Sequence, residues 1–269
     1  MKRIWLSVDW DFFQEEKVEW DWGHRETSMF AELVWPTRML SGGTDLRPIT
    51  DPDAHLPSAL GFWNRMKWNF TASEIAVTDS HAVALPFFHA IGKHEGAPDE
   101  VWNFDAHHDL GYHSLKTLRQ WAKEGRAEAG SWLYVLLRTY PELRCKFIHP
   151  IWKDPTIEAR PWLKERGVAK RVTVTKTSAF DWNEQVEVTG IFIAKSESWS
   201  PPWNDQKFTR FVEEAEQATG LPYAPYGHRD AITERAWDAA GAEKIGRFFC
   251  APVPSSQVLR SEHYSKEEL

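Results

Sequence analysis

Short apolar runs alternate with helix-forming patterns along this chain. Between the runs, apolar residues recur at helical spacing. Strands that alternate with helices are typical of a mainly parallel sheet covered by helices. The runs that predict strands are residues 3–8, 101–104, 145–149, 171–174 and 190–194. We therefore expect an α/β fold, in which residues 1–269 form a single three-layer αβα domain.

Two helices have recognisable ends in the sequence. Pro86 suits a first helical turn, which predicts a helix over about 85–93 and leaves His81 in the loop before it. A second apolar stripe begins after Asn204, a capping candidate, and is stopped by Gly220. Residues 14–75 are rich in Trp, Pro and Gly and have no clear period, so we expect irregular structure over the functional site.

Acidic and imidazole side chains directly follow two of the predicted strands. Residues at alternate positions of a strand point to one face, so such side chains can converge on one point. In parallel sheets, ligand-binding residues gather at the carboxyl ends of the strands. The candidate metal ligands are Asp9, Asp11, His81, Asp105, His107 and Asp109.

The charge of these side chains favours two metal ions. Four carboxylates in one cleft repel each other and raise each other's pKa values, whereas two divalent cations neutralise them. Carboxylate and imidazole ligands without thiolate suit octahedral Mn(II) better than a closed zinc site. Alternatively, Asp105 or Asp109 could be a helix cap, and a lone Asp-x-Asp is common in turns, but each alternative explains one acid or one pair.

The motifs resemble those of the arginase and ureohydrolase superfamily. Asp-Ala-His-His-Asp at 105–109 is similar to its Asp-x-His-x-Asp signature, and Ser-Val-Asp-Trp-Asp at 7–11 to its Ser-x-Asp-x-Asp segment. A branch that includes peptide arginases also shares the His-x-x-x-Leu-Pro pattern of 81–86 and the His-Pro-x-Trp pattern of 149–152. In ordinary arginases the Asp-x-Asp segment comes second, so the motif order here looks circularly permuted.

This resemblance implies a binuclear manganese hydrolase that converts arginine to ornithine and urea. The peptide-arginase branch modifies arginine within ribosomally made peptides, so an arginine-containing peptide is the expected substrate. Two manganese ions would activate a water for attack on the guanidinium carbon. We expect Asp105 and Asp9 to bridge the ions, His81 and Asp109 to complete one site, and His107 and Asp11 to complete the other.

The leaving amine needs a proton donor. We take His113, just past the ligand loop, as the first candidate and His149 as the second, and count His113 with Asp109 as the catalytic residues. His108 could instead support the ligands from behind. Each of these histidines could also be held by local hydrogen bonds alone.

The guanidinium group calls for a carboxylate that can accept a paired hydrogen bond. Glu197, beyond a predicted strand, is one candidate, and the cluster of His24 and Glu26 is the rival; simple surface placement is the alternative for each. Four tryptophans in polar or Pro-rich stretches could hold a peptide or a guanidinium group on a ring face. They are Trp20, Trp22, Trp199 and Trp203.

Composition narrows the function classes. A net charge of −7 argues against nucleic-acid binding and suits a cationic substrate. We see neither a signal-peptide apolar region nor a membrane-spanning apolar run, and therefore expect a cytoplasmic protein without a membrane partner. Cys145 and Cys250 are expected to be free thiols. The sequence leaves the oligomeric state open.

Two other functions fit part of this pattern. One is a deacetylase-type amidohydrolase that acts on an acylated amine, although Asp109 completes a two-metal site and deacetylases usually keep one zinc. The other is a metal-stabilised binding protein without turnover. Metal content and activity on an arginine-containing peptide would separate the three hypotheses.

Overall fold

The centre of the structure is a fully parallel sheet of eight strands. The computed structural model describes residues 1–15, 34–38, 46–54, 58–227 and 231–235. The strand order is β6-β5-β4-β1-β7-β3-β8, and β2 pairs with β7 outside this path. The strands are β1 (Lys2–Asp9), β2 (Asn69–Phe70), β3 (Ile75–Thr78), β4 (Glu100–Phe104), β5 (Arg144–His149), β6 (Val172–Lys176), β7 (Val186–Ala194) and β8 (Tyr223–Pro225).

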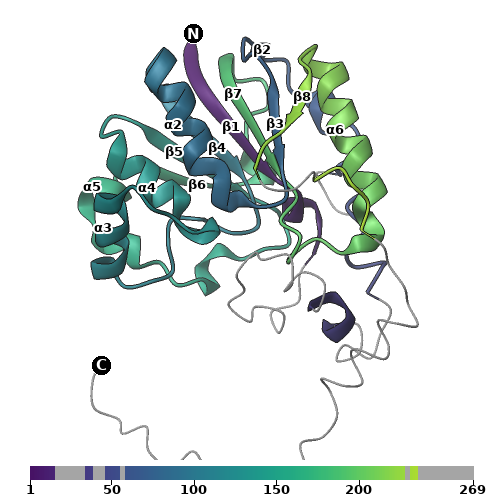
Figure 1. Cartoon of the computed structure of the whole chain (residues 1–269), viewed down its shortest axis with the longest axis horizontal. Coiled ribbons are helices and arrows are strands. Elements are labelled where there is room, and N and C mark those ends of the chain that lie inside the picture. Colours follow the sequence, from purple (N-terminus) through teal and green to yellow (C-terminus); the bar gives the residue numbers. More distant parts are fainter. Residues whose placement is uncertain (16–33, 39–45, 55–57, 228–230, 236–269) are drawn as a thin grey trace, which may run out of the picture.

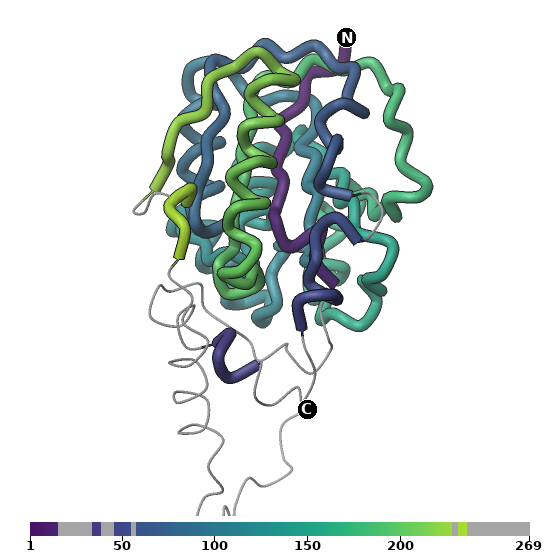
Figure 2. Tube along the Cα trace, turned by 90° about the vertical axis from the view of Figure 1, so that its right-hand side faces the viewer, coloured from purple at the N-terminus to yellow at the C-terminus, as the bar shows by residue number. Residues whose placement is uncertain are grey.

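Helices cover both faces of this sheet (Figure 1). One face carries α2 (Ala84–Glu95), α3 (Leu115–Glu124), α4 (Trp132–Thr139) and α5 (Arg166–Ala169). The opposite face carries α6 (Asp205–Thr219), the green helix in front of the sheet in Figure 2. Three layers result, which confirms the predicted α/β fold class.

Short 3-10 helices connect many of these elements. They are η1 (Trp10–Phe13), η3 (Trp63–Arg65), η4 (His81–Val83), η5 (Ala129–Ser131), η6 (Pro155–Ile157), η7 (Pro161–Lys164), η8 (Thr177–Ala179) and η9 (Pro202–Asn204). Two of them, η1 and η4, follow β1 and β3 directly or after a short turn. Two candidate metal ligands lie in these short helices: Asp11 in η1 and His81 in η4.

Successive residues of the central strands face two separate cores. In β1, Leu6 and Val8 pack into the core beneath α6, whereas Trp5 packs into the core beneath α2 and α4. In β4, Trp102 and Phe104 belong to the first core and Val101 to the second. This alternation explains why both strands are apolar throughout, as expected for strands buried on both faces.

The predicted elements are largely present. All five predicted strands form, and the predicted helix over 85–93 is α2. Gly220, in a left-handed conformation with φ 72°, ends α6. Asn204 is at the N-cap position of α6, but its side-chain amide donates to the Thr50 carbonyl oxygen at 2.6 Å instead of capping the helix.

The prediction of irregular structure over 14–75 was wrong in part. Residues 34–38 are helical, and β2 lies in this stretch. The four-residue strand β3, which ends just beyond it, was missed as well. The two-residue strand β2 is too short to reveal a hydrophobic period, because a period needs several repeats.

Two smaller expectations concern the thiols and the membrane. Cys145 is a buried free thiol, and burial raises its pKa; Cys250 lies outside the described residues. None of the helices in the described part of the chain has the length and apolar content needed to span a bilayer.

Candidate metal centre

The candidate ligands meet at the carboxyl edge of the sheet. β1 and β4 are adjacent, with Val8 paired to Phe104, so Asp9 and Asp105 follow side by side. β3 ends at the same level two strands away, and His81 begins η4 just after it. The sheet topology therefore brings together residues that lie far apart in the sequence.

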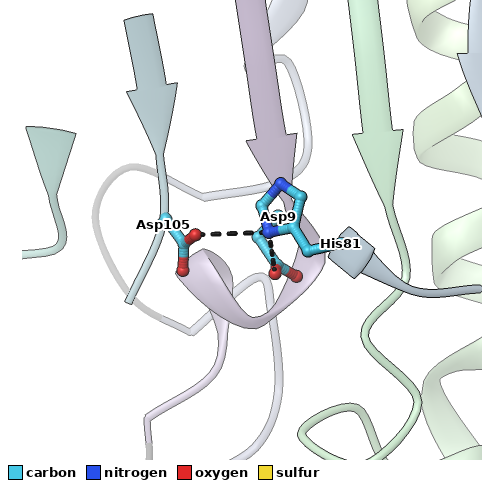
Figure 3. A group of neighbouring side chains, drawn as sticks. All are labelled: Asp9, His81 and Asp105. Atoms are coloured by element: carbon cyan, nitrogen blue, oxygen red, sulfur yellow. Dashed lines mark ion pairs between the residues drawn. The ribbon is translucent and has the colours of Figure 1, made fainter. Parts of the chain in front are cut away.

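The first group of ligand atoms consists of Asp9, His81 and Asp105 (Figure 3). His81 Nδ1 lies 2.8 Å from Asp9 Oδ2 and 3.3 Å from Asp105 Oδ2, and all three side chains are buried. Neighbouring ligand atoms of an octahedral ion with bonds of about 2.1 Å lie about 3 Å apart. The spacing in this group therefore suits a shared ion.

The second group consists of Asp11, Asp105 and His107. His107 Nδ1 lies 3.0 Å from Asp11 Oδ2 and 4.0 Å from Asp105 Oδ1. Asp105 thus belongs to both groups: Oδ2 faces His81 and Oδ1 faces His107. A carboxylate in this position can connect two neighbouring metal ions.

Asp109 lies beside the first group without joining it. Its Oδ2 is 3.1 Å from His81 Nδ1, but Asp109 is in neither set of mutually close ligand atoms. The same oxygen accepts a hydrogen bond of 2.7 Å from the indole N–H of Trp132. The backbone of Asp109 is left-handed, with φ 49°. Asp tolerates this conformation better than most residues do.

Polar side chains behind the ligands hold them in place. Ser196 Oγ donates to Asp9 Oδ2 at 2.6 Å, and Asn103 Nδ2 donates to Asp105 Oδ2 at 3.0 Å. Ser7 Oγ lies 2.8 Å from His81 Nε2. In the tautomer with Nε2 protonated, this contact leaves the lone pair of Nδ1 facing the carboxylates. Such partners orient ligands and fix the imidazole tautomer.

The electrostatics of the cluster suit a cation. Burial, together with the charges of Asp109, Asp11 and Asp9, raises the pKa of Asp105 well above its ordinary value. Burial alone would lower the pKa of His81, but the charge of Asp9 and the hydrogen bonds that the protonated imidazole donates to the carboxylates outweigh it and raise that pKa. The metal-free cluster therefore retains protons, and a divalent cation could take their place.

The types of ligand atom also suit a divalent cation. Each group offers two carboxylates and one imidazole in a buried setting, and a buried acid cluster needs compensation by protons or cations. Hard oxygen donors and imidazoles are ligands of divalent first-row metals. These buried groups could therefore hold a metal ion.

The two histidines considered for proton transfer have different surroundings. The His113 side chain is 53 % exposed, lies 3.5 Å from Glu128 and packs edge-on against Trp121 of α3. His149, in contrast, ends β5 beside β4, one residue beyond the Phe104–Ile148 pair, and is buried. The structure thus brings His149, not His113, next to the strand end that bears Asp105.

Glu197, predicted to bind a guanidinium group, faces one that belongs to the protein. Its Oε1 lies 3.8 Å from Arg235 Nε, and its backbone oxygen accepts from Arg235 Nη1 at 3.1 Å. Glu197 is buried in this arrangement. The rival candidates His24 and Glu26 lie outside the described residues.

The tryptophans proposed to hold a substrate have partners within the protein. Trp199 packs against the His107 ring at a centroid distance of 4.5 Å, and the Arg38 guanidinium lies 5.1 Å from its ring centroid. Trp203 packs edge-on against Trp35. Trp20 and Trp22 lie outside the described residues. Trp199 is therefore the described tryptophan of this set that borders the ligands.

Backbone groups hold the His108 ring, and the expectation that His108 supports the ligands from behind stays a prediction. Its Nδ1 accepts from the Leu110 N–H at 3.0 Å, and its Nε2 lies 3.0 Å from the Ala159 carbonyl oxygen. Burial lowers the pKa of His108, which keeps the neutral form that this pair of contacts needs. The imidazole therefore connects the 105–111 loop to residue 159.

Glu158 is a buried acid near this loop that the sequence did not indicate. Burial raises its pKa, but the charges of His107, His108 and Lys153 outweigh burial, so the pKa of Glu158 is lowered. Its Oε2 accepts from the Tyr112 hydroxyl at 3.1 Å. No motif surrounds Glu158. Ser7 and Asn103, in contrast, carry a signal, because each is a polar residue two positions before a ligand in an apolar strand.

Comparisons of the chain with family models, with curated proteins and with solved structures found no match. The resemblance to arginases therefore stays a prediction from the motifs. A functional assignment has to come from the chemistry of the site.

Proposed function

We propose that this protein is a binuclear manganese hydrolase that converts arginine to ornithine and urea. The observation that carries the proposal is the position of Asp105, whose two oxygens face two different ligand groups. One shared carboxylate between two Asp/His sets suits a pair of divalent ions. The similarity of the motifs to those of peptide arginases supports an arginine within a peptide as the substrate.

The ligands divide between the ions as follows. Asp9 and His81, with Asp109 beside them, would hold one ion, and Asp11 and His107 would hold the other. Asp105 would serve both. The bridging role expected for Asp9 stays a prediction, because the structure places Asp9 in one group. When bound, two manganese ions would lower the pKa of a water enough to supply a nucleophile at neutral pH.

The reaction consumes one water and breaks the bond between the guanidinium carbon and the side-chain nitrogen. The leaving nitrogen must gain a proton to become the ornithine amine. We assign this task to His149. Its Nδ1 lies 3.1 Å from the Pro150 carbonyl oxygen, so Nδ1–H donates there and Nε2 can take up and pass on a proton. Burial lowers the pKa of His149, so the imidazole is neutral near pH 7.

The substrate would approach from the His107 side. The His107 side chain is 13 % exposed, compared with 2 % for His81. Trp199 lies against His107 and would form one wall of the entrance. The net charge of −7 would favour the approach of a cation.

Mass spectrometry tests this proposal. The protein, loaded with Mn(II), is incubated with an arginine-containing peptide, with free arginine and with an acetyl-lysine peptide. We expect the arginine peptide to lose CH2N2 and urea to appear, and we expect neither with Asp105→Asn. Loss of the acetyl group from the lysine peptide, without ornithine in any sample, would instead indicate a deacetylase-type amidohydrolase.

A further inference from the structure

The indole N–H of Trp132 binds a candidate metal ligand. Its side chain is fully buried, and Nε1–H donates to Asp109 Oδ2 at 2.7 Å. Among the described residues, the buried indoles of Trp35 and Trp102 also donate, to the Glu197 carbonyl oxygen and to Glu100 Oε2. Five other buried indoles have no hydrogen-bond acceptor there: those of Trp5, Trp10, Trp63, Trp68 and Trp162. What sets Trp132 apart from Trp35 and Trp102 is that its acceptor is a candidate metal ligand.

The start of α4 holds Asp109 at a second point. The Leu133 N–H donates to the Asp109 carbonyl oxygen at 3.1 Å, and the Gly111 N–H donates to the Gly130 carbonyl oxygen at 2.9 Å. These bonds stabilise the left-handed backbone at Asp109 (φ 49°). Both the backbone and the carboxylate of Asp109 are thus fixed by residues 130–133.

Trp132 also contacts the histidine beside Asp109. The rings of Trp132 and His81 have a centroid distance of 5.3 Å. Trp132 itself is stacked on Phe88 of α2, with ring centroids 5.6 Å apart. The oxygen that accepts from the indole is the one that lies 3.1 Å from His81 Nδ1. Trp132 therefore determines where Asp109 Oδ2 lies relative to His81.

We propose that Trp132 is a positioning residue for one ion of the centre. Its indole N–H holds the Asp109 carboxylate beside His81, and this raises the affinity of the His81 site without acting on the His107 site. The inference rests on the metal centre of the proposed function and extends it to a difference between the two ions. The Asp109 oxygen that accepts this bond lies 3.1 Å from His81 Nδ1.

The test compares Trp132→Phe with Trp63→Phe. The first variant keeps an aromatic ring against Phe88 and removes the donor, whereas the second removes a buried indole N–H that has no acceptor among the described residues. Mn(II) binding is measured by calorimetry, and the coupling between the ions by electron paramagnetic resonance. Loss of a partner behind a metal ligand typically costs about 10–100-fold in affinity.

We expect wild type and Trp63→Phe to bind two Mn(II) ions with the signal of a coupled pair. Trp132→Phe should keep one ion at unchanged affinity, bind the second about 10–100-fold more weakly, and show the signal of isolated Mn(II) at low occupancy. Unchanged binding of both ions, or equal weakening of both, would overturn the role assigned to Trp132.

Two further results separate this inference from the proposed reaction. If Trp132→Phe does not fold, β-(3-benzothienyl)alanine at position 132 replaces the N–H with sulfur at nearly unchanged shape and gives the same comparison. If wild type binds two ions and Trp132→Phe loses one, but no substrate yields ornithine, the reaction is wrong and the role of Trp132 stands. If wild type binds no Mn(II), both fail.

Discussion

The two halves of the candidate centre differ in how the chain holds them. In the His81 half, the ligands contact side chains from elsewhere in the fold, including Ser7, Ser196 and Trp132. In the His107 half, backbone groups of the ligand loop bind the ligands. One example is the His107 N–H, which donates to Asp105 Oδ1 at 2.7 Å. Side chains from other parts of the fold thus hold the first half, and backbone groups of the ligand loop contribute to the second.

This difference has a functional meaning. The His81 side chain is almost fully buried, whereas the His107 side chain is partly exposed and borders Trp199. A buried and well-supported half suits an ion that stays in place. A partly exposed half suits the ion that faces the substrate.

Asp105→Asn breaks both halves at once and should have the largest effect. The substitution removes the carboxylate that both ligand groups share, so we expect binding of Mn(II) to fall to background and ornithine formation to stop. At a free metal concentration of 100 times the dissociation constant, a bound ligand stabilises a fold by about 2.7 kcal/mol. Thermal unfolding with and without Mn(II) should show this gain for wild type and not for the variant.

The exposed Asp181, in the turn after η8, provides the control. Asp181→Asn should keep the stabilisation by Mn(II) in full. If Asp105→Asn is stabilised by Mn(II) as much as Asp181→Asn, the shared carboxylate does not hold metal.

His81→Ala and His107→Ala break one half each. Each variant should bind one Mn(II) instead of two. His81 packs parallel to Phe192 in the buried half, with ring centroids 5.8 Å apart, so its removal leaves a cavity. We expect His81→Ala to lower the free energy of unfolding by about 2–4 kcal/mol and His107→Ala by less than about 1 kcal/mol. Equal losses in urea unfolding would contradict the difference between the halves.

The pH dependence of the metal-free protein sharpens the comparison further. The pKa values of Asp105 and His81 are raised in the folded state, so the folded protein keeps protons that the unfolded chain releases. This contribution to stability is present at low pH and is lost as the pH rises. Above about pH 4, near the ordinary carboxyl value, wild type should therefore lose stability relative to metal-free Asp105→Asn.

Chemical unfolding of both metal-free proteins at a series of pH values measures this difference. Titrating groups distant from Asp105 cancel in it, because they are common to both proteins, so the difference reports on Asp105 and the groups that interact with it. A difference that does not change between pH 4 and pH 8 would show that Asp105 titrates as in the unfolded chain.

Ser196→Ala should have the smallest effect on metal binding. It removes the hydroxyl that donates to Asp9 Oδ2, and we expect about 10-fold weaker binding at the His81 site and a loss of about 1 kcal/mol in unfolding free energy. Ser198 is equally buried, and its hydroxyl has no hydrogen-bond partner in the part of the chain that is described. Ser198→Ala is therefore the matched control. Equal effects of the two substitutions would contradict the role of Ser196 in supporting Asp9.

The fold and the candidate ligands were open to prediction for a physical reason. Strand residues alternate between faces, so Asp9 and Asp105 at strand ends, with His107 and Asp109 at alternate positions, stand out against apolar runs. The carboxyl edge of a parallel sheet then gives them a common location. The two ligand groups together contain five of the six predicted ligands, and Asp109 lies beside them.

The supporting residues that lie far from the ligands in the sequence were not open to prediction. Trp132 lies 23 positions from Asp109, and Ser196 lies 187 positions from Asp9. Such contacts depend on how helices and loops pack, and no local pattern records this. Glu197 is a different case. Its sequence context was compatible with a substrate site, but the sequence did not indicate that Arg235 would be its partner.

Anomalous diffraction from crystals grown with Mn(II) tests the central claim most directly. We predict two peaks, one among Asp9, His81, Asp105 and Asp109 and one among Asp11, Asp105 and His107, with a different oxygen of Asp105 bound to each ion. A single peak that Asp105 does not touch, or no peak between these side chains, would contradict the account.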